Sequence, residues 1–474
     1  MNKTMKHILN KIAAVAVSGL CLAACVEPIT VDKVDESAFN NVTNLVGSVR
    51  DLNTNKQENV VEIRKDAYNT SVLFTLGRAP KKGVDVKVAY DAAYVDTYNG
   101  IHGTSFEALP EGQFSLQNEG KIVVAPDETR SFSLDLTINP FADKEEKTYL
   151  LPLKATVTTE GVVASETRLV YLVKNMSFQG MAKPGKNKEV IAFIEVNNTN
   201  PLNALQFETE DGDLLIDYLV LFAYNINYDA EAGRVYCFAN PQCQYILDHY
   251  DEIIKPLRER GMKVIISVLG NHDMAGLAQL SDAGARAFAQ EMAALVYGYG
   301  FDGINYDDEY SASPDVSIPW FTNHSREAGN RLYFETKKAM PDKEMMSYQF
   351  GSALGDGFVD GISPGDYMDI NVGDYGRAGY PYDGMTNADC SYMSSEFAQW
   401  RSTPSSSSVA NFINSDYGYW MVFSLWNGAP SGSDLQRDFN AMNLLSQGIY
   451  GKDMKKPTIY YPQTTSLEFK PINW

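Results

Sequence analysis

Residues 301–310 read Phe-Asp-Gly-Ile-Asn-Tyr-Asp-Asp-Glu-Tyr, an apolar stretch interrupted by acidic and amide side chains. Side chains of a β-strand alternate between its two faces, so Asn305, Asp307 and Glu309 would share one face. Three polar groups on one face of an otherwise apolar strand are costly in an ordinary core. A solvated strand end is the simpler alternative. We favour an acid site, in which Glu309 donates a proton and like-charge repulsion from Asp307 raises the pKa of Glu309.

The sequence around this stretch alternates between apolar runs and amphipathic runs. Helical periodicity is present at 242–260, 282–299 and 330–340, and the strand candidates are 190–196, 216–224, 263–269, 303–307, 344–350, 368–372 and 420–425. This alternation predicts parallel strands with crossover helices, and residues 189–474 have a suitable length for an eight-stranded (β/α)8 barrel of the TIM type. The seventh strand is unclear, and 384–392 is the candidate. Barrel chemistry occurs at the carboxyl ends of strands, where Glu309 would lie.

The sequence before residue 180 contains short β-rich runs separated by turns, with almost no helical periodicity. The seven runs are 60–64, 71–77, 84–90, 120–124, 130–138, 148–156 and 168–173. Such spacing predicts an all-β sandwich. The predicted fold is therefore multidomain, with a β-sandwich at 46–178, a linker at 179–188 and the α/β barrel at 189–474. The front half contains no catalytic cluster and is expected to be an accessory module.

The first 25 residues have the features of a targeting signal. Three lysines precede a short apolar run at 12–24, which is shorter than the about 20 residues that span a bilayer. The run ends in Leu-Ala-Ala-Cys at 22–25, which resembles the lipobox of bacterial lipoproteins. Removal of residues 1–24 would leave a lipid on Cys25, with 25–45 as a tether. A lipoprotein of the cell envelope, exposed on the outer membrane, is therefore expected, with plain secretion as the alternative.

The charge and cysteine content exclude several classes of function. The chain has 40 basic and 60 acidic residues, a formal net charge of −20, which is unsuited to nucleic acid. Beyond the N-terminal segment, the cysteines are Cys237, Cys243 and Cys390, without the paired spacing of a metal site. No metal or cofactor is expected, and the protein is expected to be a monomer. Cys237 and Cys243 could form a disulfide or remain free thiols.

The sequence Asp-Gly-Ile-Asn-Tyr-Asp-Asp-Glu at 302–309 resembles the D-G-x-D-x-D-x-E signature of glycoside hydrolase family 18. Asp-Asp-Glu-Tyr at 307–310 is similar to endo-β-N-acetylglucosaminidases of the endoglycosidase H and F type. Chitinases of this family usually have tryptophan where this chain has Asp308. The stretches 193–198, 224–228 and 267–272 also resemble the early strands of these enzymes. The front half resembles the β-sandwich that often precedes such domains in lipoproteins of glycan-foraging bacteria.

The resemblance implies hydrolysis of the β-1,4 bond between the two core N-acetylglucosamine residues of N-linked glycans. It also implies substrate-assisted retention, in which the acetamide oxygen attacks the anomeric carbon and no covalent sugar–enzyme bond forms. Glu309 would protonate the leaving oxygen and then act as the base toward water. Asp307 would orient the acetamide N–H and stabilise the developing positive charge. Asp302 belongs to the same signature and is included among the predicted catalytic residues.

Asn305 departs from the family pattern, which has aspartate at this position. Asparagine donates and accepts hydrogen bonds but cannot change its charge. One outcome is that Asn305 holds Asp307 by a neutral hydrogen bond, with an altered pH profile. Another is slowed turnover, which would leave a catalytically impaired glycan-binding lipoprotein at the surface. A chitinase is a third alternative, which Asp308 disfavours.

Aromatic and amide side chains at the predicted strand ends are candidates for sugar binding, since aromatic faces bury the apolar faces of pyranose rings. They are Tyr348, Tyr375, Trp426, Asn427, Asn225, Asn227 and Asn271. Barrel packing is the alternative for the aromatic residues, and loop capping is the alternative for the asparagines. Tyr380–Tyr382 and the serine-rich 402–408 are expected in loops around the cleft. The sequence does not specify which class of N-glycan (high-mannose, hybrid or complex) is cleaved.

Overall fold

The computed structural model describes residues 46–159, 167–179, 188–350, 355–426 and 432–474. The predicted signal peptide and tether, with Cys25, lie outside these residues, as do Asn427 and nearly all of the predicted linker.

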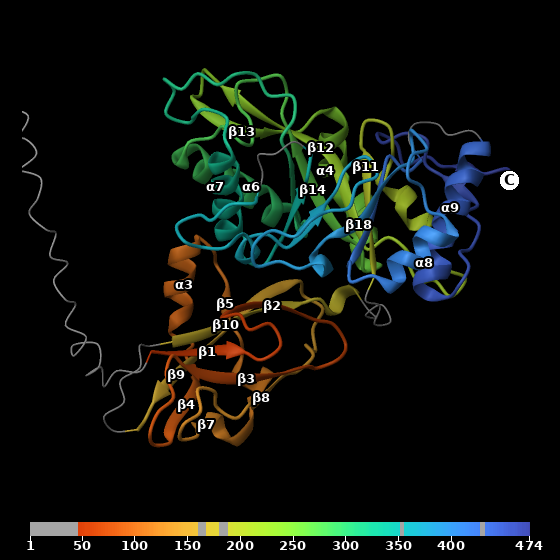
Figure 1. Ribbon diagram of the computed structural model, residues 1–474. Coiled ribbons are helices and arrows are strands. Elements are labelled where there is room, and N and C mark those ends of the chain that lie inside the picture. Colours follow the sequence, from red (N-terminus) through yellow and green to blue (C-terminus); the bar gives the residue numbers. More distant parts are fainter. Residues whose placement is uncertain (1–45, 160–166, 180–187, 351–354, 427–431) are drawn as a thin grey trace, which may run out of the picture.

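Residues 46–179, called the β domain below, form two sheets that pack face to face (Figure 1). The first sheet has the order β1 (Gly47–Asp51), β3 (Tyr68–Leu76), β8 (Leu134–Ile138) and β6 (Phe114–Leu116). The second has the order β2 (Glu58–Ile63), β10 (Thr167–Asn175), β9 (Lys147–Val157), β4 (Val84–Tyr90) and β7 (Lys121–Val124), with β5 (Glu107–Ala108) beside β9. Apolar residues of both sheets, among them Phe74 and Leu151, fill the space between them.

All seven β runs predicted from the sequence overlap a strand of the β domain. Helix α3 (Tyr94–His102) was not expected, because its periodicity is short and weak. It buries Val95 and Tyr98, three residues apart on one face, and ends at Gly103, whose left-handed φ of 71° suits glycine.

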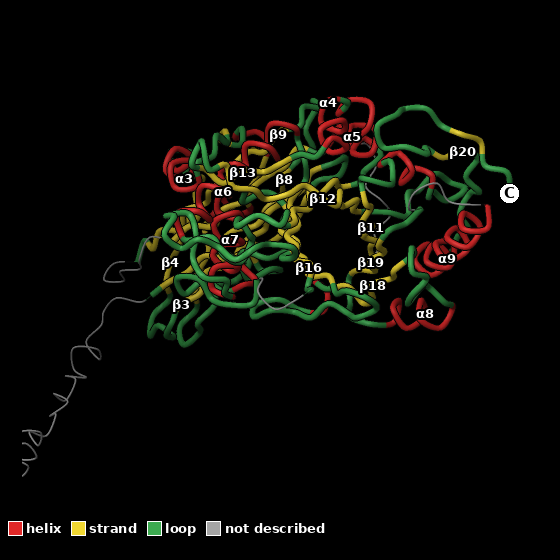
Figure 2. Tube along the Cα trace, turned by 90° about the horizontal axis from the view of Figure 1, so that it is seen from above, coloured by secondary structure: helices red, strands yellow, loops and turns green. Residues whose placement is uncertain are grey.

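Eight parallel strands from the second half form a ring, which Figure 2 shows from above. Their order around the ring is β11 (Glu189–Glu195), β12 (Tyr218–Asp229), β14 (Lys263–Leu269), β15 (Gly303–Asp307), β16 (Glu344–Tyr348), β17 (Ile370–Val372), β18 (Ser391–Glu396) and β19 (Tyr419–Phe423), which pairs again with β11. Between β17 and β18 a single bridge, Asn371 to Cys390, completes the ring. The predicted seventh strand at 384–392 was placed too early, since β18 begins at Ser391.

The helices around the barrel are α4 (Pro241–Asp248), α5 (Tyr250–Glu259), α6 (Asp282–Tyr299), α7 (Arg326–Ala339), α8 (Ser406–Asn414) and α9 (Gly432–Tyr450). Other connections in the described residues use the 3-10 turns η4 (Pro201–Gln206), η5 (Pro364–Asp366) and η6 (Asn387–Asp389), and β13 (Arg234–Phe238) forms a hairpin with β12. The strands β20 (Ile459–Tyr460) and β21 (Lys470–Pro471) form a small separate pair. The helix–strand alternation is therefore less regular than the sequence predicts.

Two helix predictions need correction. The predicted helix at 242–260 is two helices, because the chain turns at His249, whose backbone is not helical. The serine-rich stretch was expected in a loop, but Ser405 caps α8 through reciprocal contacts with Ser408. Serine is a common residue at this position because its hydroxyl accepts from a free backbone N–H.

The barrel strands are buried on both faces, as expected for parallel strands covered by helices. Phe193, Ile265, Met346 and Met421 face the interior of the ring, whereas neighbouring strand residues such as Val190 pack outward against the helices. The interior is thus filled by side chains, and only the two ends of the barrel are free for chemistry or contact.

The β domain lies at the end of the barrel where the strands begin (Figure 1). Glu62 of β2 pairs with Lys263, the first residue of β14, at 3.2 Å. Arg258 of α5 pairs with Glu146 of the β domain at 2.6 Å and with Asp302 at 2.8 Å. The carboxyl ends of the barrel strands therefore face away from the β domain.

The predicted catalytic role of Asp302 is wrong. Asp302 precedes β15, and the five-residue rise of this strand separates its backbone from that of Asp307 by roughly 16 Å. Both carboxylate oxygens accept from Arg258, at 2.9 and 2.8 Å, and one also accepts from the backbone N–H of Val264. Burial would raise the pKa of Asp302, but Arg258 outweighs this effect and the pKa is lowered. Asp302 fixes the closed end of the barrel.

Replacing Arg258 with methionine should strongly destabilise the protein. The change leaves Asp302 buried without a cation, which costs about 3–5 kcal/mol in comparable cases. Arg258 has a side chain that is 4% exposed, whereas Arg260, in a surface pair with Glu208, is 43% exposed. Arg260→Met is therefore the matched control, with an expected loss below about 1 kcal/mol. Urea unfolding measures both variants, and equal losses would contradict this role of Arg258.

Candidate active site

Asn305, Asp307 and Glu309 meet at the open end of the barrel. Asn305 and Asp307 belong to β15 and are buried, whereas Glu309, two residues beyond the strand, is partly exposed. The amide nitrogen of Asn305 donates to Ser267 Oγ of the neighbouring strand β14 at 2.8 Å. The Oδ1 atoms of Asn305 and Asp307 are buried without a hydrogen-bond partner among the described residues. Two unsatisfied oxygens on one strand face indicate a site arranged for a proton or a ligand.

Burial is the main cause of a strong rise in the pKa of Asp307, and the charges of Glu309, Asp308 and Asp374 raise it further. Asp307 therefore keeps its proton to a higher pH than an ordinary aspartate when the site is empty. A protonated carboxyl group has a donor, and the unpaired oxygen of Asn305 is an acceptor on the same face of β15. The described residues show no hydrogen bond between Asn305 and Asp307, so the first alternative drawn from the sequence stays a prediction.

Burial also raises the pKa of Glu309, with further contributions from Asp374 and Asp308, while a hydrogen bond from the Tyr310 hydroxyl opposes the rise. The sequence prediction of how Asp307 and Glu309 affect each other's pKa needs correction. It expected Asp307 to raise the pKa of Glu309, but the charge of Glu309 raises that of Asp307. The physical reason is burial: of two neighbouring acids, the more buried one retains the proton.

Two further acids at this end of the barrel were not identified from the sequence. Asp374 follows β17 and pairs with Arg377 at 2.6 Å, and Glu396 is the last residue of β18. Both are buried, and burial raises the pKa of Glu396, which accepts from Ser394 Oγ at 3.1 Å. Glu396 was missed because the seventh strand was placed too early. Asp374 could have been found as a carboxylate directly after a predicted strand.

Aromatic rings line the interior next to these acids. Tyr348, the last residue of β16, lies 5.8 Å from the ring of Phe193 and 6.3 Å from that of Phe350, and Phe350 lies 6.0 Å from Tyr375. Burial raises the pKa of Tyr348, as do the charges of the acidic groups that it faces. Tyr375 is partly exposed. The structure thus brings Tyr348 and Tyr375 to the acids, as the sequence predicts.

Asn225, Asn227 and Asn271 connect two neighbouring strand ends. Asn225 donates to the backbone carbonyl of Gly270 at 3.2 Å, and Asn271 donates to Asn227 Oδ1 at 3.1 Å. These contacts give the asparagines the loop-fixing role that was the alternative to sugar binding. Their remaining amide atoms lie at the open end of the barrel, so their contact with a sugar stays a prediction.

The predicted role of Trp426 as an aromatic floor beneath the sugar is wrong. Trp426 is 1% exposed and packs against Phe207 of η4, with ring centres 4.7 Å apart, in the layer outside the barrel. The chain turns outward after Phe423, because Ser424 and Trp426 both have left-handed backbone conformations, with φ of 57° and 53°. Phe423 instead faces the interior, close to Tyr348.

The described residues hold no cluster of three or more metal-ligating side chains of the His, Cys, Asp or Glu type. Cys237, Cys243 and Cys390 are free thiols, so Cys237 and Cys243 do not form a disulfide. None of the helices that the structure describes has the length and apolarity required to cross a bilayer.

A barrel of parallel strands with two neighbouring acids of raised pKa at its open end is typical of a barrel enzyme that uses acid–base chemistry. Similarity to known proteins identifies the family to which the chain belongs within this class. The chain is 37% identical over 274 residues to endo-beta-N-acetylglucosaminidase F1 of Elizabethkingia meningoseptica, covering 56% of this chain and 80% of that protein. It is 30% identical to an endo-beta-N-acetylglucosaminidase of Flavobacterium sp. (strain SK1022), covering 51% of this chain and 76% of that protein.

Crystal structures of EndoBT-3987 from Bacteroides thetaiotamicron have a similar fold over both domains. The structure with a Man5GlcNAc product has a TM-score of 0.83 and 39% identity, covering 89% of this chain and 99% of that one. The structure with a Man9GlcNAc2Asn substrate has a TM-score of 0.76 and 38% identity, covering 89% and 98%. A family model described as a "-like, N-terminal domain" matches residues 39–162. The chain belongs to the endo-β-N-acetylglucosaminidases of glycoside hydrolase family 18.

Replacing Asp307 with asparagine should stabilise the protein at neutral pH. The pKa of Asp307 is higher in the folded than in the unfolded chain, so its contribution is complete below the unfolded pKa and is lost as pH rises. The variant avoids this loss, which is about 1.4 kcal/mol for each unit of pKa difference. Denaturant unfolding at pH 4 and pH 7.5 measures the effect, and the gain should be larger at pH 7.5. The control Asp315→Asn, in an exposed loop, should show no such gain.

Proposed function

We propose that this chain hydrolyses the β-1,4 bond between the two core N-acetylglucosamine residues of N-linked glycans. The observation that carries the proposal is the pair Asp307 and Glu309, both with raised pKa, at the open end of a barrel with an aromatic lining. The relatives support the substrate class, since EndoBT-3987 was crystallised with a Man9GlcNAc2Asn substrate and a Man5GlcNAc product. Mannose-bearing N-glycans are therefore the first substrates to test.

The proposed mechanism uses the acetamide group of the sugar as the nucleophile. Its carbonyl oxygen attacks the anomeric carbon while Glu309 gives its proton to the leaving glycosidic oxygen, which forms an oxazolinium ion. Water then attacks the same carbon, Glu309 takes one proton from the water, and the ring opens with retained configuration. Glu309 suits both steps because its raised pKa keeps it protonated at mildly acidic pH. Attack within one bound molecule removes the need for a separate nucleophile.

Asp307 is proposed to accept the acetamide N–H and to stabilise the positive charge of the intermediate. Its unpaired Oδ1 is available for this contact. The positive charge that develops next to Asp307 opposes the effect of burial and lowers the pKa of Asp307. The carboxylate form of Asp307 is therefore favoured as the oxazolinium ion forms. The proton that Asp307 gives up passes to solvent, because Asn305, held by Ser267, forms hydrogen bonds but cannot take up a proton.

Tyr348 and Tyr375 are proposed to bind the reacting sugar. Tyr348 faces the acids from the end of β16, and Tyr375, partly exposed, extends the aromatic surface toward solvent. Aromatic faces match the apolar faces of pyranose rings and exclude water from the oxazolinium intermediate.

We further propose that the protein is a monomeric lipoprotein, with a lipid on Cys25 and the barrel exposed at the outer membrane surface. The lipobox-like sequence at 22–25 supports this placement. The β domain is proposed to be a sandwich-type accessory module, and the barrel a (β/α)8 domain in which 3-10 turns replace some helices. Metabolic labelling with a fatty acid, absent in Cys25→Ala, tests the anchor.

Glu309→Gln should abolish glycan release while glycan affinity is largely retained. The change removes the proton donor but little volume, and a general acid contributes about 10²–10⁴-fold to the rate. Mass spectrometry of glycans released from a high-mannose glycoprotein measures turnover, and calorimetry measures binding. The exposed Glu259 supplies the control Glu259→Gln, which should keep full activity. If the wild-type protein released no N-glycan between pH 4 and 8 but still bound it, the glycan-binding alternative would replace this proposal.

Asp308→Asn should shift the alkaline limb of the pH–rate profile to lower pH. The charge of Asp308 raises the pKa of Glu309, so its removal lets Glu309 lose the catalytic proton at lower pH. Asp308 contacts the His324 ring nitrogen Nε2 at 2.7 Å. The matched control is Asp366→Asn, in an exposed position of η5, and it should leave the profile unchanged. A shift of the limb to higher pH would refute the electrostatic argument.

A further inference from the structure

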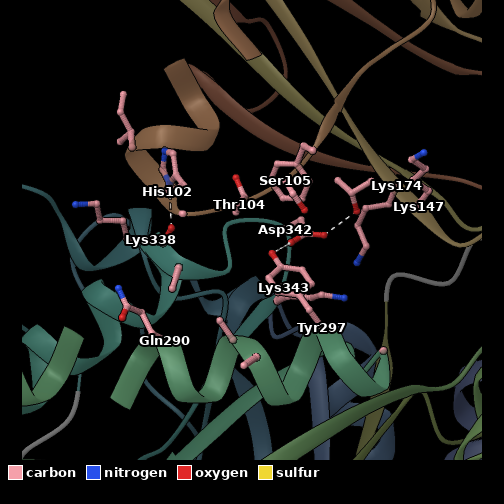
Figure 3. Close-up of a pocket in the computed structure, with 18 of the residues that line it drawn as sticks. His102, Thr104, Ser105, Lys147, Lys174, Gln290, Tyr297, Lys338, Asp342 and Lys343 are labelled. Carbon is pink, nitrogen blue, oxygen red and sulfur yellow. Dashed lines mark hydrogen bonds between the residues drawn. The ribbon is translucent and has the colours of Figure 1, made fainter. Parts of the chain in front are cut away.

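A cavity of about 870 Å³ lies between the β domain and the barrel, at the end opposite the acids (Figure 3). The loop after α3, the start of β9 and the end of β10 line it from the β domain. Helices α6 and α7 and the residues that follow α7 line it from the barrel. Its volume lies in the range of ordinary small-molecule sites, which is about 300–1,000 Å³.

Positive charge exceeds negative charge among the residues that line this cavity. The cations are Lys147, Lys174, Arg286, Lys338 and Lys343, and the carboxylates are Glu146, Glu335 and Asp342. The whole chain has the opposite balance, with a net charge of −20. The cavity is therefore a positive site in an acidic protein, and such a site attracts anions.

Each of the three carboxylates already has partners. Glu146 pairs with Arg258 at 2.6 Å, and Glu335 pairs with Arg286 at 3.4 Å. Asp342 accepts hydrogen bonds from the hydroxyl groups of Tyr297, at 2.5 Å, and Thr148, at 2.7 Å. Among the lysines, Lys147 pairs with Glu107 at 2.6 Å and Lys174 with Glu62 at 3.4 Å, which leaves Lys338 and Lys343 without a direct ion pair in the described residues.

Among the described residues, Lys343 is the buried cation of this cavity that forms no direct ion pair, although the charges of Asp342, Asp302 and Glu146 act on it. Its residue is 6% exposed, and within the described ranges its ammonium group has no hydrogen bond or ion pair. The nearest recorded contact is the ring of Tyr297, at 5.2 Å. Lys174 is also buried, and its ammonium group has one long contact, with Glu62 at 3.4 Å. An ammonium group that opens into a cavity without a direct partner can pair with an anion that binds there.

Uncharged polar groups in the same cavity are exposed and available to a ligand. The described residues form no hydrogen bond with the side chains of Ser105 and Gln290, which line the cavity from opposite domains (Figure 3). The ring of Phe106 adds an apolar surface beside Ser105. Hydroxyl groups on a ring would match this combination of donors, acceptors and an aromatic face.

We propose that this cavity binds a small hydroxylated anion, a sugar acid or a sugar phosphate, whose charged group pairs with Lys343 and Lys174. Ring hydroxyl groups contact Ser105 and Gln290. Because both domains contribute residues, the ligand also joins the β domain to the barrel. This binding is separate from catalysis, since the cavity lies at the amino ends of the barrel strands.

Calorimetry on the full chain at constant ionic strength tests the proposal with four probes: glucuronate, glucose 6-phosphate, inorganic phosphate and neutral glucose. We expect saturable binding of glucuronate or glucose 6-phosphate, and binding of glucose at least tenfold weaker. Lys343→Met should weaken binding of the anion by at least tenfold. The control Lys82→Gln, at an exposed site of the β domain, should leave the affinity unchanged. The ligand-free Lys343→Met protein should unfold at the same temperature as the wild type or a higher one.

Three results would overturn the proposal: no saturable binding of either sugar anion, equal affinity for glucose, or unchanged affinity in Lys343→Met. Equal affinity for inorganic phosphate and glucose 6-phosphate would overturn the assignment to a sugar. If Lys343→Met does not fold, a protection experiment on the wild-type protein tests the site instead. Acetylation of Lys343, followed by peptide mass spectrometry, should slow at least tenfold in the presence of the bound anion, and an unchanged rate would refute the site.

Discussion

The carboxyl group of Asp307 is buried at the end of β15 without a cation beside it, and the chemistry of the site depends on this single constraint. Asp302, just before the same strand, is equally buried, but both of its carboxylate oxygens accept hydrogen bonds from Arg258. The pKa of the paired acid is lowered and the pKa of the unpaired acid is raised. Two aspartates, one just before a short strand and one at its end, are thus shifted in opposite directions because their surroundings differ.

This difference extends to the two ends of the barrel. At the amino ends of the strands, charges form close pairs such as Glu62 with Lys263, and these pairs hold the β domain in place. At the carboxyl ends, Asp307, Glu309, Asp374 and Glu396 gather with fewer cations. Stability is provided at one end and proton chemistry at the other. The lysines of the cavity between the domains are an exception, since Lys343 is buried at the stabilising end without a pair.

The sequence was sufficient for the elements that have strong local patterns. β14, β15 and α6 begin and end where the periodicity predicts, and strand alternation places Asn305 and Asp307 on one face, whereas Glu309 lies two residues beyond the strand. The resemblance to a known family gave the reaction. What could not be predicted depends on contacts distant in sequence. Asp302 carries the family signature, but only its distant partner Arg258 shows that it is structural.

Other errors have equally specific causes. Trp426 comes three residues after Phe423, which faces the barrel interior. The left-handed backbone conformations of Ser424 and Trp426 turn the chain outward, and no sequence pattern predicts them. Glu396 was missed because β18 has few apolar residues, so the sequence lacks the apolar run that would predict a strand there. The helix α8 begins in a run of serines, which are typical of loops but also cap helices.

The ring of strands is not equally strong around its circumference. Most neighbouring strands share a ladder of pairs, but β17 and β18 meet at the single bridge between Asn371 and Cys390. A break in the ring costs least where the fewest backbone hydrogen bonds are lost. That seam adjoins Asp374 and Glu396 and lies apart from β15, so local opening of the ring is expected on this side of the catalytic end. A branched oligosaccharide could thus gain room without displacement of the acid that cleaves it.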